Sequence, residues 1–357
     1  MEQCSCKAQA AGSSPAPGSL THGERDFTWR DAERTIVFRE AAFGDAPEIV
    51  ADGPWEGFEL LTTPRALGAV PLELAERSAA VHQVPGGPVP GAAAAIIDEV
   101  RSPSLVALGG GRVIDVAKAI AAVRGGRVCA LATTLSGAEM TATHRLPAGH
   151  EEEAPHLVRP ALVIADPCEM TTLQDGRLRA SAMNALAHGA EALYAPLANP
   201  VATLAALRGA ESIAGALDQP RGRRDRAALA LGSILCAYGL DSTGYALHHV
   251  VSQTLVRTLE TPHAETNATL LPHTMRAMRS RAPEAIEALA AALGTTAGRI
   301  GSRITKLGGG KRRLRDLGAD ERRIEPALDG ILARAELANT PDPPNRSELR
   351  RLIESAW

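Results

Sequence analysis

Three histidines in the second half of the chain have the spacing of side chains that meet on neighbouring helices. Asn184 and His188 are four residues apart in an Ala- and Leu-rich run, so they share one face of a predicted helix. His249 and His263 follow in two further segments. Three neutral imidazoles around an open position can bind Zn²⁺ or Fe²⁺ and polarise a substrate oxygen, or can transfer protons themselves. The pattern predicts an active site with His188, His249 and His263 as catalytic residues and candidate metal ligands.

A glycine triplet, Gly109-Gly110-Gly111, separates the apolar run 105–108 from a helical pattern that contains Asp115. Glycines at such a junction let the backbone approach a pyrophosphate, whose charge the N-terminal end of the helix stabilises. A tight strand-to-helix turn would use the same residues, and the usual G-x-G-x-x-G spacing is absent. With the histidines downstream, we interpret the three glycines and Asp115 as cofactor-binding residues.

Hydroxyl side chains follow two other apolar runs. Thr133, Thr134 and Ser136 come after the run 128–131, where they could bond a phosphate, a ribose or a nicotinamide amide, or could cap a helix. Thr63 comes after the run 58–61, and no Asp or Glu nearby is placed to hold the 2′-hydroxyl of an NAD ribose. Arg65 could instead receive a 2′-phosphate, so the segment favours NADP(H) slightly over NAD(H).

The composition narrows the class of partner. Lys and Arg number 38 against 41 Asp and Glu, and aromatic residues make up 3%, which argues against nucleic acid and anionic membranes as partners. No apolar run is long enough to span a membrane. The five cysteines lack paired spacing and no secretory signal precedes them, so we expect a cytoplasmic protein with a small-molecule substrate.

The chain divides into three parts by texture. Residues 1–28 are rich in Ala, Ser, Gly and Pro, and we expect a disordered tail there. From 29 to 165, apolar runs at 35–38, 58–61, 105–108, 128–131 and 162–165 alternate with helical patterns, which predicts an α/β domain with a mostly parallel sheet. From 166 to 357 the spacing is helical throughout, and we expect the chemistry in the cleft between these halves.

In order and spacing these elements resemble the iron-containing alcohol dehydrogenase superfamily, and most closely its maleylacetate reductase branch. The segment 181–195 is similar almost position for position, and 262–268 and 339–357 agree further. The resemblance implies a dehydroquinate-synthase-like fold: an α/β domain that binds NAD(H) or NADP(H), an all-α domain that holds the substrate, and a homodimer. It places His188, His249 and His263 on metal-ligand positions.

Two departures lie in the histidine region. Asn184 stands where metal-dependent members carry an aspartate ligand; reductases of the maleylacetate type share the asparagine and are thought to work without a metal. The site is thus either an Fe²⁺ or Zn²⁺ centre or metal-free, with histidines that hydrogen-bond the substrate. Gln253 stands where both branches have a histidine, which leaves His248, His249 or His263 to transfer protons.

The substrate region departs from the branch as well, since Gly86-Gly87 replaces a His-Thr pair and the linker 144–159 lacks the usual lysine. We therefore expect an NAD(P)-dependent oxidoreductase that transfers hydride between nicotinamide and a small or natural-product hydroxy or keto substrate, for example a β-hydroxy acid whose keto product decarboxylates. Maleylacetate reduction in aromatic degradation is the alternative. A dehydroquinate-synthase-like lyase or cyclase, and a non-catalytic binding protein, are further alternatives.

Overall fold

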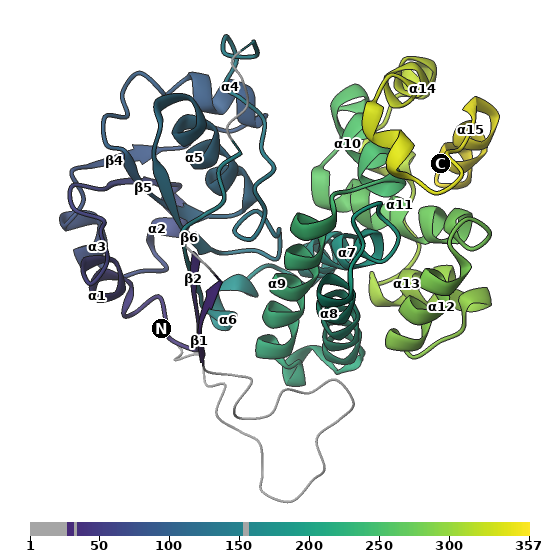
Figure 1. The fold of residues 1–357 in the computed structure, drawn as a ribbon, viewed down its shortest axis with the longest axis horizontal. Helices are drawn as coiled ribbons and strands as arrows, with labels where there is room; N and C mark the ends of the chain where they lie inside the picture. Colours follow the sequence, from purple (N-terminus) through teal and green to yellow (C-terminus); the bar gives the residue numbers. More distant parts are fainter. Residues whose placement is uncertain (1–26, 32–33, 153–156) are drawn as a thin grey trace, which may run out of the picture. The chain divides into compact units, whose positions relative to one another are not determined.

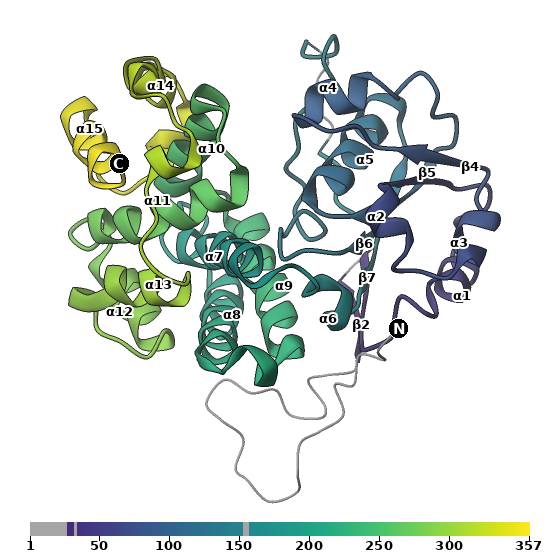
Figure 2. The same ribbon diagram turned by 180° about the vertical axis from the view of Figure 1, so that it is seen from behind.

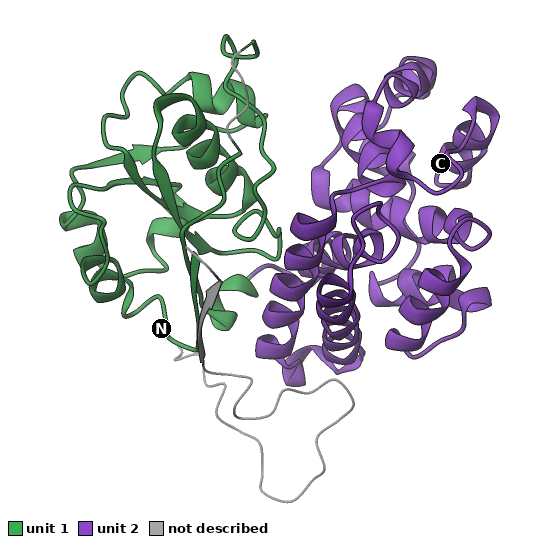
Figure 3. Cartoon of the chain, in the orientation of Figure 1, with its two compact units in different colours: residues 1–16, 20–172 green, residues 17–19, 173–357 purple. Residues whose placement is uncertain are grey.

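The structure is a computed structural model that describes residues 27–31, 34–152 and 157–357. Two compact units make up this part of the chain (Figure 3). The first ends at Thr172 and the second runs from Leu173 to Trp357, whereas the sequence had placed the change of texture at 166. The predicted tail lies outside the described residues, apart from Phe27 and Thr28. These two belong to a strand, because they pair with Phe38 and Val37 in a hairpin that the composition of the tail concealed.

Unit 1 is built on a sheet whose described strands are β1 (Phe27–Asp31), β2 (Arg34–Phe38), β3 (Glu59–Thr62), β4 (Ala80–Gln83), β5 (Ser104–Gly109), β6 (Arg127–Ala132) and β7 (Leu162–Ala165). Their order in the sheet is β1-β2-β7-β6-β5-β3-β4, and only the β1–β2 pair is antiparallel. All five apolar runs form strands, as predicted. Strand β4 was not predicted, because it lies at the edge of the sheet and two of its four residues are His82 and Gln83.

The helices of unit 1 are α1 (Ala46–Ala51), α2 (Pro64–Leu67), α3 (Leu72–Glu76), α4 (Val89–Ala94), α5 (Gly111–Arg124) and α6 (Pro167–Met170) (Figure 1). Every residue of β5 is buried, which is expected for a parallel strand covered on both faces. Around the sheet, Phe43, Trp55 and Leu74 pack with strand residues into a continuous apolar core.

The register of the sheet brings three loops to one edge. Thr62 of β3 is next to Leu108 of β5, and Gly109 at the end of β5 is next to Ala132 at the end of β6. The loops that follow these strands therefore start side by side. The chain also reverses direction across the sheet between β3 and β5, and ligands of α/β proteins bind at such points.

Unit 2 consists of helices: α7 (Asp175–Ala192), α8 (Pro200–Asp218), α9 (Arg226–Thr243), α10 (Leu247–Leu259), α11 (His263–Met278), α12 (Pro283–Ala292), α13 (Ile300–Leu307), α14 (Ile324–Leu332) and α15 (Arg346–Ser355), joined in places by short 3₁₀ turns (Figure 2). Helix α7 is buried from Ala180 to Ala192 and contacts α8, α9 and α11. A Cβ atom on Gly209 would lie 2.7 Å from the carbonyl oxygen of Gly232, so glycines let α8 and α9 approach closely. None of the described helices combines the length and apolarity needed to cross a membrane.

Candidate active site

The glycine turn of unit 1 is shaped by contacts that leave no room for a side chain. A Cβ atom on Gly109 would lie 2.7 Å from Val113, one on Gly110 would lie 3.1 Å from Thr134, and one on Gly111 would lie 2.9 Å from Ser136. Gly110 is the N-cap residue of α5 and supplies no side-chain cap. The turn thus presents backbone at the start of a 14-residue helix, an arrangement that suits a phosphate.

The hydroxyl-bearing loop lies directly against this turn. Thr133 donates its backbone N–H to the carbonyl oxygen of Gly109 at 3.0 Å, which fixes the two loops to each other. Thr63 is the N-cap residue of α2, and its Oγ1 accepts the N–H of Ala66 at 3.3 Å, so its hydroxyl caps a helix. The predicted nucleotide-binding residues therefore meet in one place, although whether they bind a cofactor stays a prediction.

A buried cluster of charged side chains in unit 1 holds the backbone that follows the hydroxyl-bearing loop. Lys118 is fully buried; its Nζ donates to the carbonyl oxygens of Ala138 at 3.1 Å and Thr141 at 2.9 Å, and lies 2.7 Å from Asp115 Oδ1. Asp115 is thereby engaged by a lysine of its own helix. Glu139 is also fully buried, and burial raises the pKa of its carboxyl to about 7.

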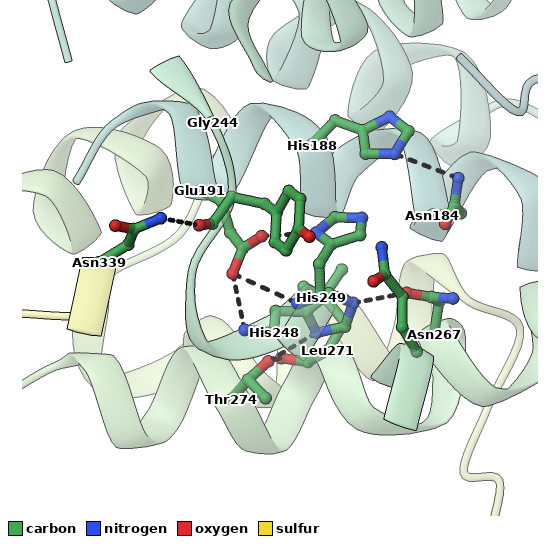
Figure 4. Close-up of polar contacts among 12 residues, drawn as sticks. Asn184, His188, Glu191, Gly244, His248, His249, Asn267, Leu271, Thr274 and Asn339 are labelled. Atoms are coloured by element: carbon green, nitrogen blue, oxygen red, sulfur yellow. Dashed lines mark hydrogen bonds and ion pairs between the residues drawn. The ribbon is translucent and has the colours of Figure 1, made fainter. Parts of the chain in front are cut away.

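In unit 2, α7 carries the first group of site residues on one face (Figure 4). Asn184 Nδ2 lies 3.5 Å from His188 Nε2, and both side chains are buried. An amide N–H that donates to Nε2 leaves the ring proton of a neutral His188 on Nδ1. Burial and the neighbouring histidines hold the pKa of His188 well below its usual value, so the ring is neutral at pH 7.

Glu191 joins α7 to the start of α10. Its Oε1 accepts the backbone N–H of His248 at 2.6 Å and of His249 at 3.4 Å, and its Oε2 lies 2.5 Å from His249 Nδ1. The carboxylate thus caps α10, whose own N-cap residue, Ala246, provides no side-chain cap. Burial raises the pKa of Glu191, while the backbone N–H groups that donate to it act in the opposite direction.

His249 is held by this carboxylate with one nitrogen left over. Its Nδ1–H donates to Glu191, so the neutral ring carries a lone pair on Nε2, and burial keeps the pKa of His249 well below its ordinary value. The His188 and His249 rings stack with centroids 4.9 Å apart. Within the described residues, neither Nδ1 of His188 nor Nε2 of His249 has a hydrogen-bond partner. A buried donor and a buried acceptor thus lie on adjacent rings.

His248 has a different role, although the sequence offered it as a proton-transfer residue. Its Nε2 lies 2.9 Å from Asn267 Oδ1 and its Nδ1 lies 3.0 Å from Thr274 Oγ1. Asn267 donates its Nδ2–H to the carbonyl oxygen of His263 at 2.8 Å, which fixes the orientation of the amide. Both ring nitrogens of His248 are therefore occupied, and the residue fastens α10 to α11.

His263 begins α11 and is exposed, unlike His188 and His249. It contributes to the lowered pKa of both of those histidines and so lies near them, but that the three side chains act together stays a prediction. In the described part of the chain, however, no three His, Cys, Asp or Glu side chains are grouped as ligands of one metal ion. Asn184 supplies no negative charge and Glu191 is engaged by N–H groups. Without an anionic ligand this donor set holds a divalent cation less tightly, and whether the site is metal-free stays a prediction.

Sequence reasoning missed Tyr245, which precedes α10, and the pair Arg334 and Glu336, which follows α14. Tyr245 has its ring centroid 6.1 Å from that of His249, and its hydroxyl accepts from Arg334 Nη2 at 2.8 Å. Gln253 accepts from Arg334 Nη1 at 3.0 Å, and Tyr245 donates to Glu336 at 2.7 Å. In the sequence, Arg334-Ala-Glu336 has the pattern of an ordinary solvated charge pair, so no local signal identified it.

The chain also matches known proteins along most of its length. Residues 179–357 match the model of the Fe-containing alcohol dehydrogenase family, C-terminal domain. The chain belongs to this family. Maleylacetate reductase 1 of Rhodococcus opacus is 35% identical over 260 residues, which cover 71% of this chain and 72% of that protein. A maleylacetate reductase of Burkholderia cepacia is 31% identical over 348 residues, or 95% and 94% of the two chains.

Solved structures agree with this placement. The crystal structure of maleylacetate reductase from Agrobacterium tumefaciens matches with a TM-score of 0.79 and 28% identity, over 93% of this chain and 98% of that one. The predicted fold and the predicted maleylacetate reductase branch are thus confirmed. The family member described here is an oxidoreductase, which favours that class over the lyase and the binding protein.

Proposed function

We propose that this family member is an NAD(P)H-dependent reductase of a small carboxylic acid that carries a ketone or a conjugated enone, as in maleylacetate. The observation that carries the proposal is the His249 imidazole, oriented by the buried carboxylate of Glu191 and stacked on His188. The similarity to maleylacetate reductases over nearly the whole chain supports the choice of substrate class.

Unit 1 would bind the nucleotide. The glycine turn presents backbone N–H groups at the start of α5 for the pyrophosphate, and the loop of Thr133, Thr134 and Ser136 lies against that turn. Arg65, exposed in α2 after the end of β3, supports NADPH over NADH, because a guanidinium can pair with a 2′-phosphate.

Unit 2 would bind the substrate and transfer a proton to it. A nicotinamide bound by unit 1 would supply the hydride, and the carbonyl oxygen of the substrate would take up the resulting negative charge as an alkoxide or enolate. The Nδ1–H of His188 is a donor for that oxygen, and charge stabilisation of this kind is often the largest contribution to catalysis. A proton from solvent, carried by His249 Nε2, completes the reduction, and Glu191 stabilises the transient imidazolium.

Burial keeps His249 neutral at pH 7, so its Nε2 is an acceptor at the start of the reaction. An acceptor at this position would also take up the proton of a substrate hydroxyl, and oxidation of a β-hydroxy acid is therefore a second candidate activity.

The test is consumption of NADPH and NADH with maleylacetate by chelator-treated protein, with parallel samples supplied with Zn²⁺ or Fe²⁺. We expect turnover that survives chelation, with NADPH preferred. Reduction of NADP⁺ by a β-hydroxy acid, with no activity on maleylacetate, would establish the second candidate instead. Turnover that returns only with added metal would contradict the metal-free assignment.

A further inference from the structure

Gln253 lies four residues after His249 on α10, so the two side chains share a face of the helix. The residue is half-buried rather than enclosed. Neither role of its amide, donor or acceptor, depends on pH in the range where an imidazole titrates.

The orientation of this amide is fixed by Arg334. The guanidinium Nη1 donates to Gln253 Oε1 at 3.0 Å. Arginine has no acceptor, so the oxygen of the amide must face Arg334 and the NH₂ group must face away from it. Gln253 therefore presents N–H donors, and not its oxygen, on the side opposite to Arg334.

Arg334 is itself held by several partners, and 13% of its side chain is exposed. Nη2 donates to Tyr245 Oη at 2.8 Å and to Glu336 Oε1 at 3.0 Å, and the guanidinium lies 5.5 Å from the centroid of the Tyr245 ring. Asn339 donates to the backbone carbonyl of Tyr245 at 2.9 Å. These bonds join the segment after α14 to the start of α10 and leave Arg334 little freedom.

We propose that Gln253 is a substrate-binding residue whose amide N–H donates to a carboxylate oxygen of the substrate, and that Arg334 is the positioning residue that sets the amide. The proposal rests on the proposed function for the class of substrate, a small dicarboxylate. A histidine at this position would hold an anion less well once its imidazole lost its proton. The amide of Gln253 keeps its N–H donors at every pH in this range, so its contact with a carboxylate would not weaken.

The direct test is binding of adipate, a six-carbon dicarboxylate, measured by isothermal titration with the full chain. Gln253→Met keeps the length and removes the donors, so we expect the Kd for adipate to rise about 10-fold or more, because the ligand carboxylate loses a charge-assisted hydrogen bond. Gln253→Glu keeps the shape but offers only acceptors to Arg334 and to the ligand, and should weaken binding further. Arg257→Met on the same helix, whose guanidinium donates to Thr254, is the matched control and should leave Kd unchanged.

Arg334→Met tests the positioning role, because it frees the amide without removing it. We expect a smaller rise in Kd than for Gln253→Met, and no added effect when the two are combined. Gln253→His should bind adipate better than Gln253→Met at pH 5.5, where the imidazole is protonated, and should lose this advantage at pH 8. The Kd of the wild type should change little between the two pH values. Circular dichroism melts identify any variant that does not fold.

The outcomes separate this inference from the proposed function. Adipate binding that is equal in wild type, Gln253→Met and Gln253→Glu, or absent from the wild type, would overturn the role of Gln253. Absence of NAD(P)H consumption with maleylacetate, together with the expected series of Kd values, would overturn the proposed function and leave the amide contact standing.

Discussion

The candidate site in unit 1 is built mainly from backbone, whereas the candidate site in unit 2 is built from side chains. In unit 1 the predicted nucleotide site is made of backbone, and its glycines are needed because Val113, Thr134 and Ser136 leave no space for a Cβ atom. In unit 2 the site is made of buried side chains, which are held by a carboxylate that also caps α10. We therefore expect the site in unit 1 to be sensitive to a larger side chain at a glycine, and the site in unit 2 to be sensitive to the loss of the Glu191 charge.

We expect the largest effect from Glu191→Gln. This substitution removes the negative charge beside His249 but keeps an oxygen that can accept from the backbone N–H groups of α10. Without the carboxylate, the imidazolium of His249 loses its stabilising partner and its orientation. We expect kcat to fall by roughly 10²–10⁴-fold, the size of a lost general acid–base contribution. Steady-state kinetics with maleylacetate measure it, and a kcat within fivefold of wild type in a folded variant would contradict the role of the pair.

Glu139 tests whether unit 1 also depends on a buried charge. Its pKa is raised from 4.5 to about 7 in the folded protein, so the folded state retains a proton that the unfolded state releases. Stability is therefore fully present below pH 4.5 and falls as the pH rises toward 7, by roughly 3 kcal/mol if each pKa unit contributes about 1.4 kcal/mol. Glu139→Gln should remove this slope in denaturant unfolding of unit 1. An equal slope in the variant would show that another group titrates.

Gly111→Ala tests the close approach in unit 1. The new Cβ atom would lie 2.9 Å from Ser136, so the hydroxyl-bearing loop must shift, at a cost of about 1–3 kcal/mol. We expect the Kd for NADPH to rise about 10-fold or more, with the His249 region unaffected. Gly91→Ala in α4 of the same unit meets nothing within 4 Å and should bind NADPH like the wild type. Equal affinity in the two variants would place the nucleotide elsewhere.

The smallest effect concerns the choice of nucleotide. Arg65→Gln removes an exposed charge in α2, so the affinity for NADPH should fall by up to about 5-fold while that for NADH is unchanged, as for an exposed ion pair of up to about 1 kcal/mol. Fluorescence titration with both nucleotides measures the ratio. A loss shared by NADH and NADPH would mean that Arg65 does not meet the 2′-phosphate.

The features that could be predicted from the sequence are those with local signals. The five buried strands are short apolar runs, and Asn184 and His188 share a helical face by spacing. The hairpin strand β1 and the edge strand β4 lack that signal, since their residues are mixed in polarity. The Arg334–Gln253 contact joins residues 81 positions apart, and nothing in either segment marks its partner. Glu191 is one turn beyond His188 on the same helix, but its role depends on where α10 begins, which the sequence of α7 does not indicate.

The central claim is that unit 1 binds the nucleotide and unit 2 carries the catalytic side chains. Titration of NADPH into Glu191→Gln tests it most directly. We expect wild-type affinity for the nucleotide in a protein whose turnover has collapsed, because the substitution changes only the buried network of unit 2. A folded variant that loses nucleotide affinity and turnover together would contradict it, and would show that the carboxylate on α7 supports nucleotide binding as well.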